Sequence, residues 1–347
     1  MEFIKPNINI DFVGKRKIAY AVSFSMILIS ILSLVFHGGP KYGIDFVGGT
    51  VIQIKFPAPV TISDIKIGLA EMGMENSTIQ TFGNETDHDY LIRTESPLQT
   101  DDSFSQKIKA AVQKTTGVEP DIRRVEMVGP QVGKDLQEKA MFAIFYSMLF
   151  IAIYISGRFE FKWAACATIA GVLMGGIYLL SMLSITMAIL IPMALLITIV
   201  LFWFLNLKYA MGAIISLIHD VVITVGCFSL LGKEFSLPII AAVLSIMGYS
   251  LNDTVIVFDR IRENLKKHPK NTFISTINRS VNETLSRTIL VSATTLVAVL
   301  ALFILGGGII HDFAFAMLVG ILTGTYSSIY VASPILLAWQ DAAAKKK

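Results

Sequence analysis

Charged residues and cysteines are both scarce in this chain. Asp, Glu, Lys and Arg make up 16% of its 347 residues, and the formal net charge is only +3. A nucleic-acid-binding surface needs a concentrated basic patch, so the weak net charge argues against that class of function. The two cysteines, Cys166 and Cys227, lie in apolar runs and are interpreted as small membrane-buried hydrophobes, without a disulfide framework.

A cleavage site for a leader peptide is also missing. The first apolar run, at about 18–36, is too long for the hydrophobic region of a signal peptide. Gly38, Gly39 and Pro40 follow it where a small-x-small cleavage site would stand. We therefore expect this run to be an uncleaved membrane anchor.

Long apolar runs are abundant. Hydrophobic residues make up 54% of the chain, and its mean hydropathy of +0.64 exceeds what a soluble core of this size can bury. A helix that spans a bilayer needs about 20 apolar residues. Eight runs qualify as candidate spans, at about 18–36, 139–156, 163–183, 187–206, 209–231, 237–258, 284–305 and 312–337.

Lysine and arginine predict the orientation of these spans, because positive charges gather on the cytoplasmic side of membrane proteins. With eight spans, the basic clusters before the first, after the sixth and after the last fall on one side, where they can also contact anionic lipid. We expect residues 1–36 to be a cytoplasmic N-terminus and first helix, and 37–138 to be a periplasmic domain. Residues 139–347 would form a seven-helix bundle with a cytoplasmic connection at 259–283 and a cytoplasmic C-terminus.

Segment 37–138 has the pattern of a small α+β domain. Strand patterns occupy 51–56, 78–82, 90–93 and 122–128, a turn falls at 83–87, and helical patterns cover 61–72 and the region after 104. Ser63 or Asp64 could cap the first helix. The order βαββαβ predicts a ferredoxin-like domain. His88 stands alone in a turn, so we expect no enzyme active site, metal or cofactor.

Asp253 places a carboxylate within a predicted membrane helix. A charge there costs several kcal/mol unless it is paired or hydrated, so such groups are by default proton or ion sites. Ser245, Tyr249 and Asn252 share its face of the helix. The stripe fits a proton relay, and it also fits polar contacts that hold helices together.

Arg287 lies near the start of the seventh span. It either pairs with Asp253, which is expected in the same leaflet, or extends to the cytoplasmic interface. Its broad face of the helix carries Thr284, Thr288, Thr294 and Thr295.

Asp220 lies near the middle of the fifth span, with Ser216 and Thr224 one turn away on either side. His219 beside it is either a group that titrates near neutral pH or a satisfied core histidine. We predict Asp220 as a further relay candidate.

Five sequence blocks follow one another along the chain. They are Tyr42-Gly43-Ile44-Asp45-Phe46-Val47-Gly48-Gly49, Val128-Gly129-Pro130-Gln131-Val132-Gly133, His219-Asp220-Val221, Gly248 to Asn264, and Asn282-Glu283-Thr284-Leu285-Ser286-Arg287-Thr288. Together they resemble the SecF branch of the SecD/SecF family of protein-export membrane proteins, in the resistance-nodulation-division superfamily. The resemblance covers nearly the whole chain.

This resemblance implies an accessory subunit of the Sec preprotein translocase in the bacterial inner membrane. Such a subunit works with a SecD-like partner beside the SecYEG channel, and uses the proton-motive force to pull or release the emerging preprotein. The implied proton-relay candidates are Asp253, Arg287, Asp220 and Asn252. The implied family motif and hinge of the external domain consists of Gly43, Asp45, Gly48 and Gly49.

The chain departs from the family pattern after Arg158-Phe159-Glu160. The family passes from this tripeptide directly into the helix with His-Asp, whereas here a segment at about 161–206 intervenes and supplies two extra spans. The usual six spans thus become eight, and the sidedness downstream is unchanged. The insert is interpreted either as a lipid-facing addition or as a docking surface.

Two other functions fit parts of the sequence. A small-molecule efflux transporter of the same superfamily shares the charged membrane core, but it usually has two large external domains and about twelve spans. A purely structural assembly subunit would use its polar faces only to hold a complex together. Export with and without a proton gradient, and co-purification of a SecD-like partner, distinguish these alternatives.

Overall fold

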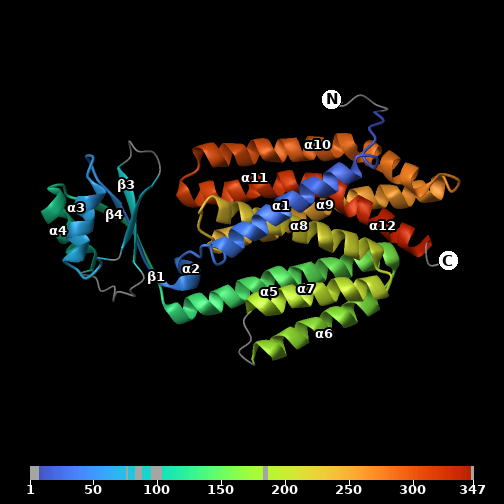
Figure 1. Cartoon of the computed structure of the whole chain (residues 1–347). Coiled ribbons are helices and arrows are strands. Elements are labelled where there is room, and N and C mark those ends of the chain that lie inside the picture. Colours follow the sequence, from blue (N-terminus) through green and yellow to red (C-terminus); the bar gives the residue numbers. More distant parts are fainter. Residues whose placement is uncertain (1–7, 76, 83–87, 95–103, 183–186, 345–347) are drawn as a thin grey trace.

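The chain forms a small external domain and a long helical bundle in the computed structural model (Figure 1), which describes residues 8–75, 77–82, 88–94, 104–182 and 187–344. The turn predicted at 83–87 lies outside these residues. The main bundle helices are α1 (Arg16–Phe36), α5 (Pro130–Ile155), α6 (Trp163–Ser181), α7 (Met187–Phe204), α8 (Lys208–Leu230), α9 (Leu237–Lys267), α10 (Phe273–Leu305) and α11 (Gly308–Ser327). Each of the first seven predicted spans overlaps one of these helices, and the eighth, at about 312–337, begins in α11 and continues beyond its end.

Two of these helices continue through π-helical turns. The turn η2 (Ser156–Glu160) ends α5, and η3 (Ser328–Ala332) joins α11 to α12 (Ser333–Ala344). Within the described residues, seven helical segments are long and apolar enough to cross a membrane. The apolar run of α7, Ile189–Phe204, measures only about 24 Å at 1.5 Å per residue, against about 30 Å of hydrocarbon. The multi-span helical fold is confirmed, and the count of eight spans stays a prediction.

The polar stretch 259–283 is mostly helix. α9 continues to Lys267 and α10 begins at Phe273, after Thr272 caps it by accepting a hydrogen bond from the amide of Ser275. Ion pairs one turn apart, such as Lys267 with Glu263, stabilise helices in water. The charged residues therefore indicate where each helix leaves the lipid, and they do not mark where the helix ends. The prediction of a connection over the whole range 259–283 was wrong. α5 likewise begins nine residues before the predicted span at 139.

The external domain has the predicted βαββαβ order. Its elements are β1 (Gly49–Lys55), α3 (Ile62–Ala70), β2 (Thr78–Phe82), β3 (Asp89–Thr94), α4 (Phe104–Thr116) and β4 (Asp121–Val128). The sheet is antiparallel with strand order β2-β3-β1-β4. Thr61 caps α3, since its hydroxyl accepts from the amide of Asp64, so neither Ser63 nor Asp64 is the cap. The ferredoxin-like assignment rests on this order and stays a prediction.

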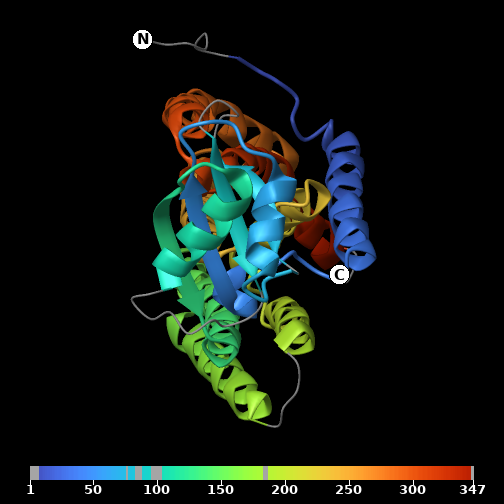
Figure 2. The same ribbon diagram turned by 90° about the vertical axis from the view of Figure 1, so that its left-hand side faces the viewer.

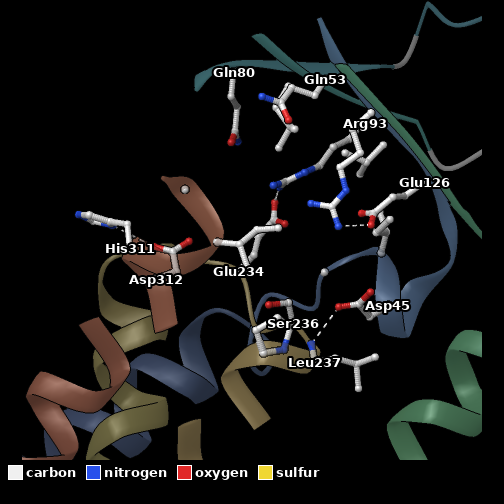
Figure 3. A pocket seen from close by; sticks show the side chains of 18 of the residues that line it. Asp45, Gln53, Gln80, Arg93, Glu126, Glu234, Ser236, Leu237, His311 and Asp312 are labelled. Atoms are coloured by element: carbon white, nitrogen blue, oxygen red, sulfur yellow. Dashed lines mark hydrogen bonds and ion pairs between the residues drawn. The ribbon is translucent and has the colours of Figure 1, made fainter. Parts of the chain in front are cut away.

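The two faces of the sheet have different surroundings, the helices α3 and α4 on one side and the bundle on the other. Ile52, Ile54 and Ile92 are fully buried on the face that α3 and α4 cover, and Figure 2 shows these helices on the side away from the bundle. Strand residues alternate between faces, so Gln53 and Arg93 point the other way, toward the outer connections of the bundle (Figure 3). This face has no helix of its own domain over it.

Helix α8 is the centre of the bundle. It contacts α1, α5, α7, α9 and α11, and most of the side chains along it are buried. α6, by contrast, lies at the edge (Figure 1). A polar side chain on α8 is therefore held away from lipid, and it needs partners on the surrounding helices.

Candidate functional site

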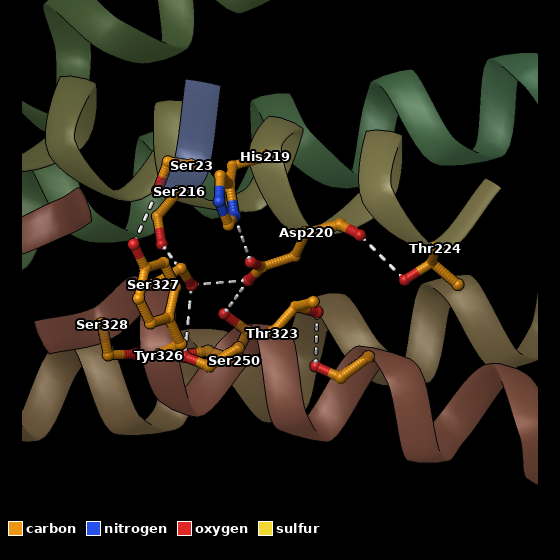
Figure 4. Close-up of polar contacts among 12 residues, drawn as sticks. Ser23, Ser216, His219, Asp220, Thr224, Ser250, Thr323, Tyr326, Ser327 and Ser328 are labelled. Atoms are coloured by element: carbon orange, nitrogen blue, oxygen red, sulfur yellow. Dashed lines mark hydrogen bonds and ion pairs between the residues drawn. The ribbon is translucent and has the colours of Figure 1, made fainter. Parts of the chain in front are cut away.

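Asp220 is the centre of a buried polar network between three helices (Figure 4). Its carboxyl group is completely buried. Ser250 of α9 donates to Oδ2 at 2.6 Å, and Ser327 of α11 donates to the same atom at 2.8 Å. His219 Nδ1 lies 2.9 Å from Oδ1. The carboxyl group thus joins α8 to α9 and α11 in the middle of the bundle.

The network extends from Asp220 to α1. The ring of His219 stacks on Tyr326 with centroids 5.9 Å apart. The Tyr326 hydroxyl donates to the carbonyl oxygen of Ala19 at 2.7 Å and lies 3.0 Å from Ser23 Oγ. Nε2 of His219 is buried and has no hydrogen-bond partner within the described part of the chain. His219 is therefore paired on one ring nitrogen only.

A π-helical turn lies beside this network. η3 follows Ser327 directly, and Ser328 within it lies 3.0 Å from Thr254 Oγ1. π-turns carry one extra residue per turn and are frequent at functional sites. Gly324 brings α11 close to α9 here, since a Cβ at this position would lie 3.0 Å from Cβ of Ser250. The small residue allows the serines of α11 to reach across to α9.

Asp253 lies on α9 and is 2% exposed. Arg287 and Ser292 of α10 are its electrostatic and hydrogen-bonding neighbours. The carboxyl group and the Arg287 guanidinium form no ion pair within 4.0 Å, and Oδ2 has no hydrogen-bond partner among the residues that the structure describes. Buried carboxyl oxygens normally have partners. Asp253 therefore has an open position for a proton or a new partner.

Ser292 connects the surroundings of Asp253 to α11. Its hydroxyl lies 2.7 Å from Thr325 Oγ1 and accepts from Tyr249 at 3.4 Å. Tyr249 of the polar stripe on α9 thus contacts α10, and Asp253 faces the same helix. Ser245 instead donates to its own helix, at the carbonyl oxygen of Ala241, and takes no part in the network.

Arg287 and Asn252 are exposed on the isolated chain. They lie on α10 and α9, two helices that pack against each other. A charged side chain within a bilayer must face protein or water because contact with lipid tails is too costly. This face of the bundle is therefore uncovered in the single chain, and snorkelling of Arg287 to the interface remains the alternative.

The threonines that share the face of Arg287 behave in two ways, since the buried hydroxyl of Thr288 has no hydrogen-bond partner among the described residues and the others bond within α10. Thr284, Thr294 and Thr295 donate to carbonyl oxygens of their own helix. Thr224 does the same toward the carbonyl oxygen of Asp220, so it does not contact the carboxyl group. This back-bonding satisfies a hydroxyl locally, which helical periodicity cannot reveal.

The glycine-rich motif after α1 ties the external domain to α9. Asp45 lies in α2 (Ile44–Val47) and accepts from the amide of Leu237, the first residue of α9, at 2.9 Å. An acidic side chain there satisfies a free amide and suits the helix dipole. Gly43 donates to the carbonyl oxygen of Phe235 at 2.9 Å. The motif thus contacts the start of the helix that carries Asp253.

The second half of this motif is a close-packed joint. Gly48 has φ +84°, and a Cβ there would lie 2.7 Å from Pro130 at the start of α5. Only glycine adopts this backbone without strain. Gly49 follows with φ 125°. The hinge role of these glycines stays a prediction.

The two ends of the insert lie side by side. Lys162 donates to the carbonyl oxygen of Leu205 at 2.7 Å, so the two ends of the segment lie together. Arg158, just before the insert, pairs with Asp259 of α9 at 2.5 Å. α6 and α7 pack on α5, and α7 also contacts α8. The insert therefore lies outside the network around Asp220.

The external domain offers no comparable chemistry. His88 lies just before β3 and no other histidine is near it in the sequence. In the part of the chain that the structure describes, no group of three or more His, Cys, Asp or Glu side chains is placed to hold a metal ion. Sequence reasoning found both membrane carboxyl groups, and it missed Ser250, Ser327 and Ser292, which connect them to other helices.

The chain is similar to known proteins over most of its length. The pattern described as "Protein export membrane protein SecD/SecF, C-terminal" matches residues 107–188 and 180–342, and the "SecD/SecF GG Motif" matches residues 33–60. Identity to "Protein translocase subunit SecF" of Desulfurispirillum indicum is 40% over 339 residues, or 95% of this chain and 92% of that protein. The protein of the same name from Vibrio alginolyticus is 36% identical over 336 residues, or 97% of this chain and 91% of that protein.

Two solved structures are also similar. SecDF from Thermus thermophilus, a translocon-associated membrane protein, matches with a TM-score of 0.69 and 30% identity, over 96% of this chain and 39% of that one. SecDF in its super-membrane-facing form matches with a TM-score of 0.58 and 31% identity, over 100% of this chain and 40% of that one. The chain thus spans about two fifths of the SecDF chains it matches.

Proposed function

The chain belongs to the SecD/SecF family of protein-export membrane proteins, and on this basis we propose that it is a proton-coupled accessory subunit of the Sec translocase. The observation that carries the proton coupling is Asp253, a buried carboxyl group on a membrane helix with one oxygen unpartnered. Arg287 is close enough to act on it electrostatically without a fixed ion pair. A group with these neighbours can take up and release a proton.

The electrical driving force is large enough for this purpose. One charge that crosses the membrane potential releases about 2.3 kcal/mol per 100 mV. A tenfold shift between two conformations takes about 1.4 kcal/mol. Proton passage at Asp253 can therefore bias α9, and through the Asp45 contact with Leu237 it can bias the external domain.

A SecD-type partner would complete the membrane part. Arg287 and Asn252 need a protein or water neighbour in place of lipid, and the isolated chain leaves both exposed. The SecDF chains are more than twice as long as the part this chain matches. We therefore place the partner against the α9–α10 face.

The cellular setting follows from the same reasoning. The family and the basic clusters support the inner membrane, with both termini in the cytoplasm and the external domain in the periplasm. There the domain would act on a preprotein that emerges from the SecYEG channel. The small-molecule efflux alternative has no support from the relatives, which are named as translocase subunits.

A purely structural role has one observation in its favour. Asp220 is bonded to two serine hydroxyls and to a histidine, as expected for polar contacts that hold helices together. Proton coupling at Asp253 and a structural role at Asp220 are compatible. A scaffold alone would make the subunit insensitive to the gradient.

Preprotein export into inner-membrane vesicles tests the proposal. Vesicles that contain this subunit and its SecD-type partner are compared with vesicles that lack both, with ATP supplied and with the proton gradient intact or collapsed by an ionophore. We expect the gradient to stimulate export only when both subunits are present. Equal stimulation in the depleted vesicles would reject proton coupling by this subunit.

A further inference from the structure

A cavity of about 500 Å³ separates the external sheet from the bundle (Figure 3). One wall is the helix-free face of the sheet, with Gln53, Arg93 and Arg124. The other wall is formed by the α8–α9 connection, with Glu234, and by the start of α11, with Asp312. The two parts of the molecule are thus held apart over this area.

At one side of the cavity, the external domain and the bundle are joined by backbone contacts and close packing. There α2 packs on α5, Gly48 lies against Pro130, and Asp45 caps α9. Across the cavity, the external domain and the bundle are joined by an ion pair between side chains. Of the ion pairs between described residues, only that of Arg93 on β3 with Glu234 joins a strand to a bundle connection.

Two carboxylates of the bundle act on Arg93. Its guanidinium contacts Glu234 directly, and Asp312 attracts it from the next connection. Burial lowers the pKa of Arg93 from its ordinary value, and Asp312 opposes that change. The side chains of Arg93 and Glu234 are 23% and 19% exposed, so water and salt screen this pair less than a surface pair.

These two carboxylates lie next to the helices that carry the membrane charges. Glu234 stands three residues before α9, which carries Asp253. Asp312 is in α11, directly after α10 with Arg287. A displacement of α9 relative to α10 and α11 therefore moves the carboxylates that hold Arg93.

We propose that the Arg93–Glu234 ion pair is a releasable latch that couples movement of the membrane helices to opening of the external domain. This inference rests on the proposed function, and it names the residues that transmit the movement. The pair joins two side chains and no backbone, so it can break and re-form in each cycle while the joint at Gly48 stays intact.

Charge reversal tests the latch. Arg93→Glu and Glu234→Arg each place like charges together, and we expect each to lower gradient-stimulated export about two- to fivefold. The double variant restores an opposite pair and should regain at least half of the loss, although Lys41, 3.5 Å from Glu234, then faces a like charge. The matched control reverses Lys114 and Glu71, an ion pair of 2.8 Å within the external domain. Single variants with full activity, or a double variant no better than the singles, would overturn the latch.

A reversible cross-link gives a readout that does not depend on folding of the reversed variants. Arg93→Cys and Glu234→Cys are introduced together with Cys166→Ala and Cys227→Ala, and a reductant-cleavable bis-thiosulfonate reagent bridges the two thiols. We expect bridging to abolish most gradient-stimulated export and reductant to restore it. The control bridges cysteines at Lys114 and Glu71, which lie in the same domain.

The two proposals fail in different ways. If the protein with its native Arg93 and Glu234 shows no gradient stimulation, then proton coupling itself is wrong. If the unbridged protein responds to the gradient and the bridged protein responds equally, then proton coupling stands and the latch is wrong.

Discussion

Glu160 caps the start of α8 by accepting a hydrogen bond from the amide of Tyr209 at 2.8 Å, although 49 positions separate the two residues. The residue at the cap position, Leu207, has no side chain that can do this. Glu160 of the tripeptide Arg158-Phe159-Glu160 thus caps α8, which is the helix that would follow the tripeptide directly if the insert were absent. The match of the family pattern is divided inside the insert as well, at residues 180–188.

Deletion of 161–206 should leave a folded protein. Glu160 would then stand three residues before Tyr209, a spacing at which a side chain can reach a first-turn amide. We expect the variant to insert into the membrane and to co-purify with its SecD-type partner. Loss of membrane insertion would show that α6 and α7 belong to the core of the bundle.

Asp253→Asn should abolish gradient-stimulated export and spare assembly. The amide keeps the size of the side chain, removes the titratable proton and is easier to bury than an unpaired carboxylate. The measurement is export at constant ATP with and without the gradient. Asp259→Asn on the same helix is the control, since the side chain of Asp259 is 41% exposed and pairs with Arg158 outside the network around Asp220, so this variant should retain the response. A gradient-responsive Asp253→Asn variant would end the relay hypothesis for this residue and leave Asp220 as the candidate.

Asp220→Ala should lower the stability of the bundle. It leaves the hydroxyls of Ser250 and Ser327 and one nitrogen of His219 without their acceptor, at about 1–3 kcal/mol for each buried group that stays unpaired. Thermal unfolding in detergent measures the change, with Thr224→Val as the control because Thr224 bonds only to a backbone carbonyl. An unchanged melting temperature for Asp220→Ala would show that the network contributes no net stability.

Cysteine labelling tests the orientation. Lys66 is exposed on α3 of the external domain, and Lys270 is exposed between α9 and α10. In right-side-out vesicles a membrane-impermeant maleimide should modify a cysteine at Lys66 and spare one at Lys270. Modification of both would contradict the predicted sidedness.

Local patterns predicted the elements well and the site only in part. β2 was predicted at its observed bounds because β-branched and aromatic residues are frequent there, whereas α9 and α10 extend beyond the prediction because charge was taken to end the helix. Asp253 and Asp220 stood out because carboxylates in apolar runs are rare. Ser250 and Ser327 did not, since serine is common in membrane helices and only packing decides whether it bonds across or within its helix. The same reason explains why the sequence could not show that Thr294 and Thr295 bond within their own helix.

Helix α9 is held at two points along its length. Asp45 holds its first amide at 2.9 Å, and Arg158 holds Asp259, eight residues before the end of the helix, at 2.5 Å. Neither bond survives if the helix slides along its own axis by one turn, about 5.4 Å. Between these fixed points stands Gly248, where no atom lies within 4 Å of a Cβ position. A movement of α9 that keeps both bonds must therefore be a bend or a rotation between them, and Gly248 is the position with the most room for it.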